Sequence, residues 1–279
     1  NRHNTNSVKW GKLEELYGRE DLLPLWVADM DFPVSTAISE ALKTRMEHGV
    51  YGYNFISSEY YEAVIGWMKR RHRWDVKKEW IIFTPGVVPA LSYAVRAFTK
   101  PGDKVILQSP VYHPFYSSIE DNGRHVVSNP LIYKDGKYYM DYEDLERKID
   151  SRTRLLFLCS PHNPVGRVWT KEELKRLGEI CLKNNIIIVS DEIHFDIVFK
   201  GYEHTVLTNI SEEIKENSII CTAPSKTFNI AGLQVSNIII PNEKLREKFS
   251  FELEKDHISR PNIFGAEALI AAYNKSEDW

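Results

Sequence analysis

Five short apolar runs, each followed by a polar turn, constrain the fold of this chain more than any other feature of its sequence. Amphipathic stretches with helical spacing separate the runs, as in 171–183. Strands that alternate with helices form a mostly parallel sheet, whose ligand crevice lies beyond the carboxyl ends of the strands. We therefore expect an α/β fold in which the five turns meet along one edge of the sheet. The turns are PGVV, SPVY, CSPHNPVG, SDEIH and APSK, which begin at residues 85, 109, 159, 190 and 223.

Apolar or β-branched runs mark the expected strands, at residues 80–83, 104–108, 124–128, 155–159, 186–190 and 218–221. Helical spacing predicts further helices at 34–47 and 58–71. The polar opening segment and the extended run LPLWVADMDFP form an arm over residues 1–32. We place a ligand-binding domain at 33–261. Residues 262–279 begin a helix that we expect to be cut off rather than completed.

The overall charge argues against two classes of partner. The 279 residues carry a formal net charge of −3 and have a pI near 6.3. Neither value gives an electrostatic reason for nucleic acid or an anionic membrane to be the main partner. No apolar run approaches the roughly 20 residues that a membrane-spanning helix needs. We expect a small-molecule ligand, and we predict no metal, nucleic-acid or membrane partner.

The cysteines point to a reducing compartment. Cys159, Cys181 and Cys221 are odd in number and form no C-x-x-C pair. Two of them end apolar runs, where a buried thiol is the ordinary interpretation. We therefore expect a cytoplasmic protein. Because the first residue is not Met, a leader could precede it.

Lys226 lies in the last of the five turns, directly after the apolar strand 218–221. Its neighbours Ser225 and Thr227 are uncharged, so its amine is less well solvated than that of a surface lysine. The pKa of such an amine can fall, and the neutral form can attack a carbonyl. Lys226 is therefore a candidate to hold an aldehyde cofactor, although an S-K pair alone more often marks a solvated loop lysine.

The turn at Gly86 opens a predicted helix and could bind a phosphate. Gly86 permits close approach of the backbone, and Pro89 takes a first-turn position whose N–H would be unbonded in any case. The free amides of Val87 and Val88 point outward. Most turns of this kind bind nothing, so the glycine alone is weak support. Tyr112 stands at the next strand-to-helix turn.

Two further turns carry side chains suited to an aromatic cofactor. Asp191 follows IIIVS, where burying its carboxylate without a cationic partner would be costly. A protonated pyridine nitrogen would supply that partner; a cap on the next turn is the alternative. Asn163 is fixed between Pro161 and Pro164. Its amide could donate to a phenolate oxygen, unless it forms a simple Asx turn.

Taken together and in this order, these motifs resemble fold type I pyridoxal-phosphate enzymes of the class I and II aminotransferase superfamily. The phrases LPLWVADMDFP, YGY, SPHNPVGRVWTKEEL, SDEIHFD and SKTFNIAGLQ look most like its cystathionine β-lyase branch, the MalY/PatB-like C–S lyases. The resemblance covers essentially the whole chain. It implies pyridoxal 5'-phosphate as cofactor and an α/β large domain with a mostly parallel seven-stranded sheet and helices on both faces. It also implies a missing C-terminal small domain, with a substrate-binding Arg beyond Trp279.

The same resemblance implies a role for each candidate residue. Lys226 would form the Schiff base, and Asp191 would pair with the pyridine nitrogen. Asn163 would bond the phenolic oxygen, and Tyr112 would stack on the ring. The phosphate would be held by Gly86, Val87, Val88 and Ser225.

Two positions depart from the pattern of many aminotransferases of this fold. His194 stands three residues after Asp191, where they have Tyr, and it is the C–S lyase-like choice. Gln234 stands eight residues after Lys226, where they have Arg. We therefore expect a tyrosine from a partner subunit to help bind the phosphate. Tyr53 of the loop GVYGYNF is the candidate by resemblance, although such aromatic loops are more often packing features.

The resemblance favours an enzyme that splits cystathionine- or cysteine-type amino acids by α,β-elimination into pyruvate, ammonia and a thiol. It also favours a homodimer with a shared active site. Two alternatives stay open. An aminotransferase would use the same residues, and a non-catalytic pyridoxal-phosphate-binding regulator would fit a chain that stops before the substrate-carboxylate domain.

Overall fold

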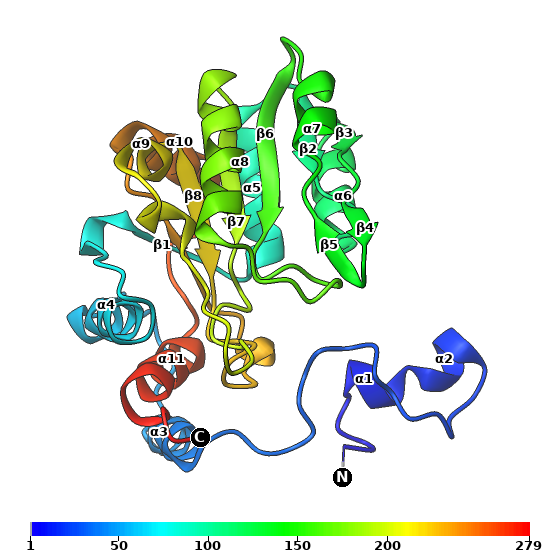
Figure 1. The fold of residues 1–279 in the computed structure, drawn as a ribbon. Helices are drawn as coiled ribbons and strands as arrows, with labels where there is room; N and C mark the ends of the chain where they lie inside the picture. The colour runs from blue at the N-terminus through cyan, green and yellow to red at the C-terminus, as the bar shows by residue number, and fades with distance from the viewer. Residues whose placement is uncertain (1) are drawn as a thin grey trace.

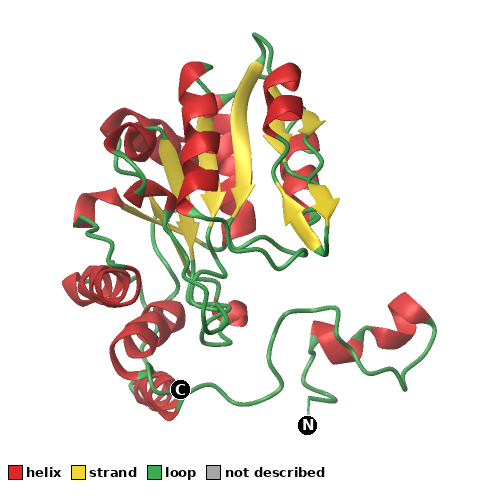
Figure 2. Ribbon diagram, in the orientation of Figure 1, coloured by secondary structure: helices red, strands yellow, loops and turns green. Residues whose placement is uncertain are grey.

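A seven-stranded sheet forms the centre of the computed structural model, which describes residues 2–279 (Figures 1 and 2). Its strands lie in the order β1-β9-β8-β7-β6-β2-β3. β9 runs antiparallel to both of its neighbours, and the other neighbouring pairs are parallel. The strands are β1 (Ile81–Thr84), β2 (Lys104–Leu107), β3 (His125–Ser128), β6 (Thr153–Cys159), β7 (Ile187–Asp191), β8 (Ser218–Thr222) and β9 (Ser236–Ile239), and a separate hairpin joins β4 (Ile132–Lys134) to β5 (Lys137–Tyr139).

The predicted seven-stranded, mostly parallel sheet is confirmed, but the sequence analysis did not identify β9. Ser236 and Asn237, half of this strand, are polar and fully buried. The Ser236 and Thr84 hydroxyl oxygens lie 2.8 Å apart, and Asn237 accepts a hydrogen bond of 2.7 Å from the Tyr60 hydroxyl. These partners are 152 and 177 residues away in the chain. The local sequence SNII therefore does not show a strand, because distant side chains satisfy its polar groups.

Helices bury both faces of the sheet, as the alternation along β6 shows. Leu155 and Phe157 belong to one hydrophobic core, and Leu156 and Leu158 belong to the other. Full burial of each such side chain stabilises the fold by about 1.5–3 kcal/mol. The first core includes residues of α5 (Val87–Phe98), α6 (Pro114–Glu120) and α10 (Glu243–Lys255), and the second includes residues of α7 (Tyr142–Lys148), α8 (Lys171–Lys183) and α9 (Glu212–Glu216).

Helix α8, predicted at these same residues, shows how local sequence sets an element. The Thr170 hydroxyl accepts a hydrogen bond from the Glu173 N–H at 3.2 Å, and the Glu173 carboxylate accepts one from the Thr170 N–H at 2.8 Å. This capping box satisfies two donors that the first turn leaves free. Leu174, Leu177 and Cys181 follow at helical spacing and are buried in the core. The cap fixes where α8 begins, and the apolar stripe fixes which side faces the sheet.

A second group of helices lies beyond the carboxyl ends of the central strands (Figure 1). Trp67 stacks on Tyr273 within this group, with ring centroids 5.2 Å apart. The helix expected from residue 262 onward spans Ile263–Lys275, and the Ser276 N–H bonds to the Ala272 carbonyl. The group consists of α3 (Thr36–Glu47), α4 (Ser58–His72) and α11 (Ile263–Lys275).

The N-terminal arm is tied together by charged side chains. Asp29 binds Arg2 at 2.6 Å, and Asp31 binds Lys9 at 2.7 Å. Lys9 is buried, so this pair is screened less than a surface ion pair. The remaining short elements are α1 (Val8–Gly11) and α2 (Leu13–Tyr17) in the arm, and the 3₁₀ turns η1 (Lys78–Trp80), η2 (Leu207–Asn209) and η3 (Ala231–Leu233).

Two helical glycines provide a matched test of the packing beneath α8. A Cβ at Gly178 would lie 2.7 Å from Ile214 Cγ1 of the buried core, whereas a Cβ at Gly66 would meet only the flexible end of Arg70, at 2.9 Å. We expect Gly178→Ala to lower the free energy of unfolding by about 1–3 kcal/mol. Gly66→Ala should leave it unchanged or raise it by up to about 1 kcal/mol, because alanine favours helix. Urea unfolding of both variants checks this, and equal effects would contradict the close packing of α8 on α9.

Candidate active site

The carboxyl ends of the central strands point to one group of loops (Figure 2). Cys159, Asp191 and Cys221 are register neighbours near the ends of β6, β7 and β8. β1 and β2 run in the same direction, so their turns emerge at this edge too. Antiparallel β9 begins at the edge, because Ser236 pairs with Thr84 at the end of β1. The topology therefore brings the five predicted turns to one side of the sheet.

Asp191 is the buried charge of this edge. The residue is only 5% exposed. Among the described residues its carboxylate accepts one hydrogen bond, from the Ile193 N–H at 3.1 Å. Among residues 2–279 no ion pair reaches it. Burial raises the pKa of Asp191 to about 7. The site therefore holds a carboxyl group whose ionised form lacks a cationic partner, which is costly in a protein interior.

Lys226 lies in a tight turn at the end of β8. Two backbone hydrogen bonds close the turn, from Phe228 to Pro224 at 2.9 Å and from Ile230 to Ser225 at 3.2 Å. The Lys226 amine contacts the carbonyl oxygen of Ala28 in the arm at 3.5 Å. The arm thus forms one wall of the site, which the sequence analysis did not anticipate.

His194 belongs to the same site as Lys226 and Asp191. Burial, together with the nearby positive charge of Lys226, lowers the pKa of His194 to about 4. The charge of Lys226 also opposes the rise in the pKa of Asp191. The amine is therefore within electrostatic reach of both side chains, and His194 is neutral at neutral pH.

Tyr112 lies at the open side of this group. It is 40% exposed, and its pKa is raised by partial burial and by the negative charge of Asp191. A half-open aromatic ring beside a buried carboxylate is a suitable surface for a flat, cationic ligand ring.

Asn163 lies in the turn after β6 and bonds to the strand residue that pairs with Asp191. Its N–H donates to Cys159 Sγ at 3.3 Å, and Cys159 is the register partner of Asp191. His162 joins this turn to the turn after β2, because its Nε2–H donates to the Pro110 carbonyl at 2.9 Å. Burial lowers the pKa of His162 to about 4, so the ring is neutral. The sequence analysis did not single out His162, whose partner lies 52 residues away.

The start of α5 has the form of an anion site. Gly86 is its N-cap, and no side chain of residues 2–279 caps the helix. The first amides of a twelve-residue helix, including those of Val87 and Val88, are therefore free to bind a ligand at the positive end of the helix dipole. A Cβ at Gly86 would approach Pro89 Cδ to 3.3 Å, so a larger residue would crowd this turn. Ser225, the other predicted phosphate ligand, immediately precedes Lys226.

A cation that the sequence analysis missed lies beside this turn. Arg260 and Gln234 line a cavity of about 330 Å³ together with Pro85. No spacing rule from Lys226 identifies Arg260, because α10 and the following loop intervene. Tyr53 stands apart from the group around Lys226: its side chain is fully exposed, and its ring centroid lies 5.7 Å from the Arg260 guanidinium.

These residues fit pyridoxal phosphate by the chemistry of their donors and charges. Asp191 is a buried carboxylate without a cation, as a pyridine nitrogen requires. The uncapped start of α5 offers amides to a phosphate. Lys226 offers an amine on the same edge of the sheet.

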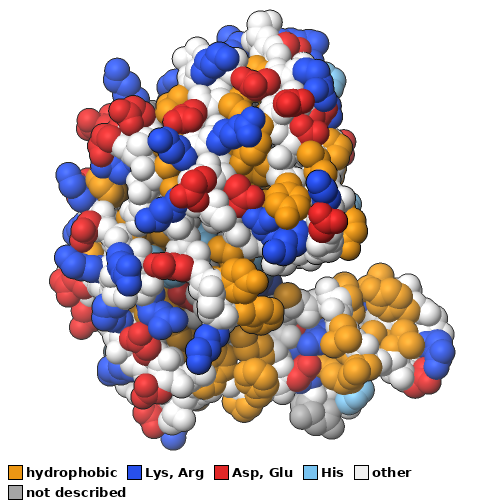
Figure 3. Space-filling view, in the orientation of Figure 1, with side chains coloured by type: hydrophobic (Ala, Val, Ile, Leu, Met, Phe, Trp, Pro, Cys, Tyr) orange, Lys and Arg blue, Asp and Glu red, His pale blue; other side chains and the backbone are white. Residues whose placement is uncertain are grey.

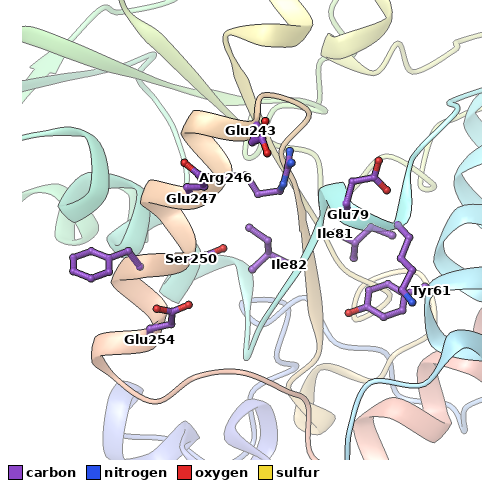
Figure 4. A pocket seen from close by; sticks show the side chains of 11 residues that line it. Tyr61, Glu79, Ile81, Ile82, Glu243, Arg246, Glu247, Ser250 and Glu254 are labelled. Atoms are coloured by element: carbon purple, nitrogen blue, oxygen red, sulfur yellow. The ribbon is translucent and has the colours of Figure 1, made fainter.

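A larger cavity, of about 630 Å³, lies elsewhere (Figure 4). It opens between α10 and the start of β1, with Glu243, Glu247 and Glu254 on the helix and Glu79 across from them. The carboxylates outnumber the cations Lys78 and Arg246, and the start of β1 is at the opposite end of the strand from the five turns. This cavity does not suit a phosphorylated ligand.

Comparisons with known proteins agree with this geometry. The sequence profile described as aminotransferase class I and II matches residues 20–278. The chain is 52% identical to cystathionine beta-lyase PatB of Bacillus subtilis over 279 residues, which are all of this chain and 72% of that protein.

Two solved structures are similar over the whole chain. Cystalysin from Treponema denticola, which contains a pyridoxal 5'-phosphate cofactor, matches with a TM-score of 0.96 and 43% identity over 72% of its own chain. The PLP-bound C–S lyase from Staphylococcus hominis matches with a TM-score of 0.92 and 34% identity over 70% of its chain. The architecture around the five turns is therefore shared with structures that hold this cofactor.

The burial of Asp191 predicts a pH-dependent cost in the cofactor-free protein. Its folded-state pKa of about 7 lies above the ordinary value of 3.8, so its contribution to stability is present below pH 3.8 and is lost as the pH rises through 7. That shift corresponds to roughly 4 kcal/mol. Because asparagine does not ionise, the free energy of unfolding of Asp191→Asn should not fall in this way as the pH rises. We expect the variant to gain stability relative to the wild type between pH 4 and pH 8, measured by urea unfolding without cofactor.

Asp75→Asn is the matched control, because the Asp75 side chain is 84% exposed. The free energy of unfolding of Asp75→Asn should change with pH as that of the wild type does. A parallel pH dependence of Asp191→Asn and wild type would show that Asp191 is not buried as described.

Proposed function

Because this chain belongs to the class I and II aminotransferase family, we propose that it is a pyridoxal-phosphate-dependent C–S β-lyase. Its substrates are cystathionine- or cysteine-type amino acids, and its products are pyruvate, ammonia and a thiol. The observation that carries the proposal is the buried carboxylate of Asp191, which has no cationic partner among the described residues and shares its site with Lys226. The named relatives, a cystathionine beta-lyase and a C–S lyase, support the choice of reaction.

The cofactor, when bound, withdraws electrons from Cα of the amino acid, which makes the Cα proton acidic and allows the Cβ–S bond to break. Lys226 Nζ would hold the cofactor at its aldehyde carbon, and once the amino acid displaces it the amine would remove the Cα proton. His194, neutral because of its lowered pKa, adds no competing positive charge beside this amine. The thiolate leaves from the open side of the site.

The other residues hold and orient the ring. Asp191 would keep the pyridine nitrogen protonated, and that cation would offset the cost of burying the carboxylate. The Asn163 side chain would donate to the phenolic oxygen, and Tyr112 would lie against the ring. Ser225 and the backbone around Gly86, Val87 and Val88 would bind the phosphate.

Amino transfer is the second candidate, favoured by the description of the matching family. It uses the same residues and differs in where Lys226 returns the proton. His194, which stands where many aminotransferases have Tyr, is instead the residue that resembles the C–S lyases. The choice between the two reactions therefore depends on whether the Cβ–S bond breaks before Lys226 returns the proton.

The proposal includes a homodimer with a shared active site. Large apolar side chains are exposed in the loop between α3 and α4, where Tyr53 is 100% and Phe55 is 80% exposed. The arm exposes Leu23 and Leu25, and Figure 3 shows apolar side chains gathered on its surface. Such patches are characteristic of interfaces. Tyr53 of one subunit would reach the phosphate of the other.

The compartment we propose is the cytoplasm. Cys159, Cys181 and Cys221 are all free and buried. Free thiols of this kind suit a reducing environment. None of the helices formed by residues 2–279 is long and apolar enough to cross a membrane.

The direct test is to supply purified protein with pyridoxal phosphate and cystathionine and to measure pyruvate. We expect pyruvate release, little amino transfer to added 2-oxo acids, and cofactor on Lys226 after borohydride reduction and peptide mapping. Lys226→Ala should lose both activity and labelling, whereas Lys200→Ala, which changes an exposed loop lysine, should keep both. Amino transfer without pyruvate would contradict the lyase, and labelling at another lysine would contradict the site.

The shared site is tested by subunit complementation. Tyr53→Phe should weaken cofactor binding by roughly 1.5–3 kcal/mol, the value of one hydrogen bond to a charged group. Tyr133→Phe, at another exposed tyrosine, should not. Mixing Tyr53→Phe subunits with Lys226→Ala subunits should restore activity, because one site of each mixed dimer is intact. No recovery despite proven subunit exchange would rule out a tyrosine supplied by the partner.

A further inference from the structure

Asp196 was not among the predicted site residues, yet it bonds to the turn that carries Lys226. Its side chain is 2% exposed. One carboxylate oxygen, Oδ2, accepts a hydrogen bond of 2.7 Å from the Thr227 hydroxyl. Thr227 directly follows Lys226, so this bond fixes the backbone next to the reactive amine.

Helix α4 holds Asp196 in place from the other side. Trp67 Nε1 donates to Oδ2 at 3.2 Å, and His72 Nε2 lies 2.7 Å from Oδ1. The His72 ring is itself stacked on Phe195, with centroids 4.0 Å apart. With donors on both oxygens, the buried carboxylate has one orientation, and hydrogen bonds to a charged group are stronger than neutral ones.

The same helix packs against the next residue of the turn. The Trp67 ring lies edge-on to Phe228, with centroids 5.3 Å apart, and Phe228 is 2% exposed. Two consecutive residues after Lys226 are thus held by α4, one through Asp196 and one by direct packing. On its far side the turn is tied to the arm, because the Asn229 side chain accepts from the Met30 N–H at 2.9 Å.

The Lys226 side chain has little to orient it directly. Among the described residues its amine makes one long hydrogen-bond contact, of 3.5 Å, with the Ala28 carbonyl. The direction of the amine is therefore set by the backbone of the turn, and the backbone is set by its anchors. Among the side-chain anchors of the turn, the bond from the Thr227 hydroxyl to Asp196 is the nearest to Lys226, and its acceptor is a buried carboxylate.

We propose that Asp196 is a positioning residue which, through the Thr227 hydroxyl, holds the Lys226 amine in the orientation needed to move the substrate proton. The role of Lys226 rests on the function proposed above. Asp196 itself touches neither substrate nor cofactor. Its effect belongs to the proton-transfer step rather than to substrate binding.

Thr227→Val tests this in the full chain, because it removes the hydroxyl and keeps the shape. In the cofactor-loaded protein kcat should fall roughly ten- to a hundredfold, the equivalent of one such hydrogen bond. KM should stay within about twofold. In the cofactor-free protein the Lys226 amine should react faster with trinitrobenzenesulfonate, since an amine that the turn no longer holds in place is more accessible to the reagent. Thr227→Ser, which keeps the hydroxyl, should restore both.

Thr222→Val is the matched control. Its hydroxyl is buried on β8 and donates to the Asn237 carbonyl at 3.0 Å, so the same chemical change is made four residues before Lys226 but outside the turn. Asp196→Asn combined with Thr227→Val should cost little more than Thr227→Val alone. Equal kcat and equal amine labelling for Thr227→Val and Thr222→Val would overturn the positioning role. Absence of cofactor on Lys226 in the wild type would overturn the proposed function instead, and the labelling comparison would still decide the role of Asp196.

Discussion

The buried carboxylate of Asp191 is the interaction on which the site depends. It ends β7, the middle strand of the sheet, so apolar cores lie on both sides and little water reaches it. A protein interior tolerates such a group only when something stabilises it, and here the protein supplies one backbone N–H. The fold therefore carries a local instability that a cationic ring relieves. Cofactor binding and folding stability are linked through this one group.

The parts around Asp191 come from segments far apart in the chain, and each has a distinct physical task. The start of α5 contributes uncapped amides, which attract an anion without a charged side chain. The turn after β8 contributes the amine, and the arm contributes a carbonyl beside it. Helix α4 lies behind the turn and fixes it through Asp196. Catalysis by such a site depends on keeping these groups in place, since the cofactor supplies the electronic effect.

Much of this could be predicted from the sequence, and the exceptions share one cause. The parallel strands, α8 and the polar turns have local signals: apolar runs, helical spacing and a capping box. β9 lacked such a signal because Ser236 and Asn237 are satisfied by distant partners. His162 and Asp196 were missed for the same reason, since their roles exist only once the turns and α4 are packed together.

The most direct test of the account is to observe the protonation of the pyridine nitrogen itself. Cofactor labelled with ¹⁵N at that position, bound to the wild type and to Asp191→Asn, reports the proton through its NMR chemical shift. The account predicts a protonated nitrogen in the wild type at pH 8 and an unprotonated one in the variant, because in this account the Asp191 carboxylate stabilises that proton. An unprotonated nitrogen in the wild type, or the same shift in both proteins, would contradict it.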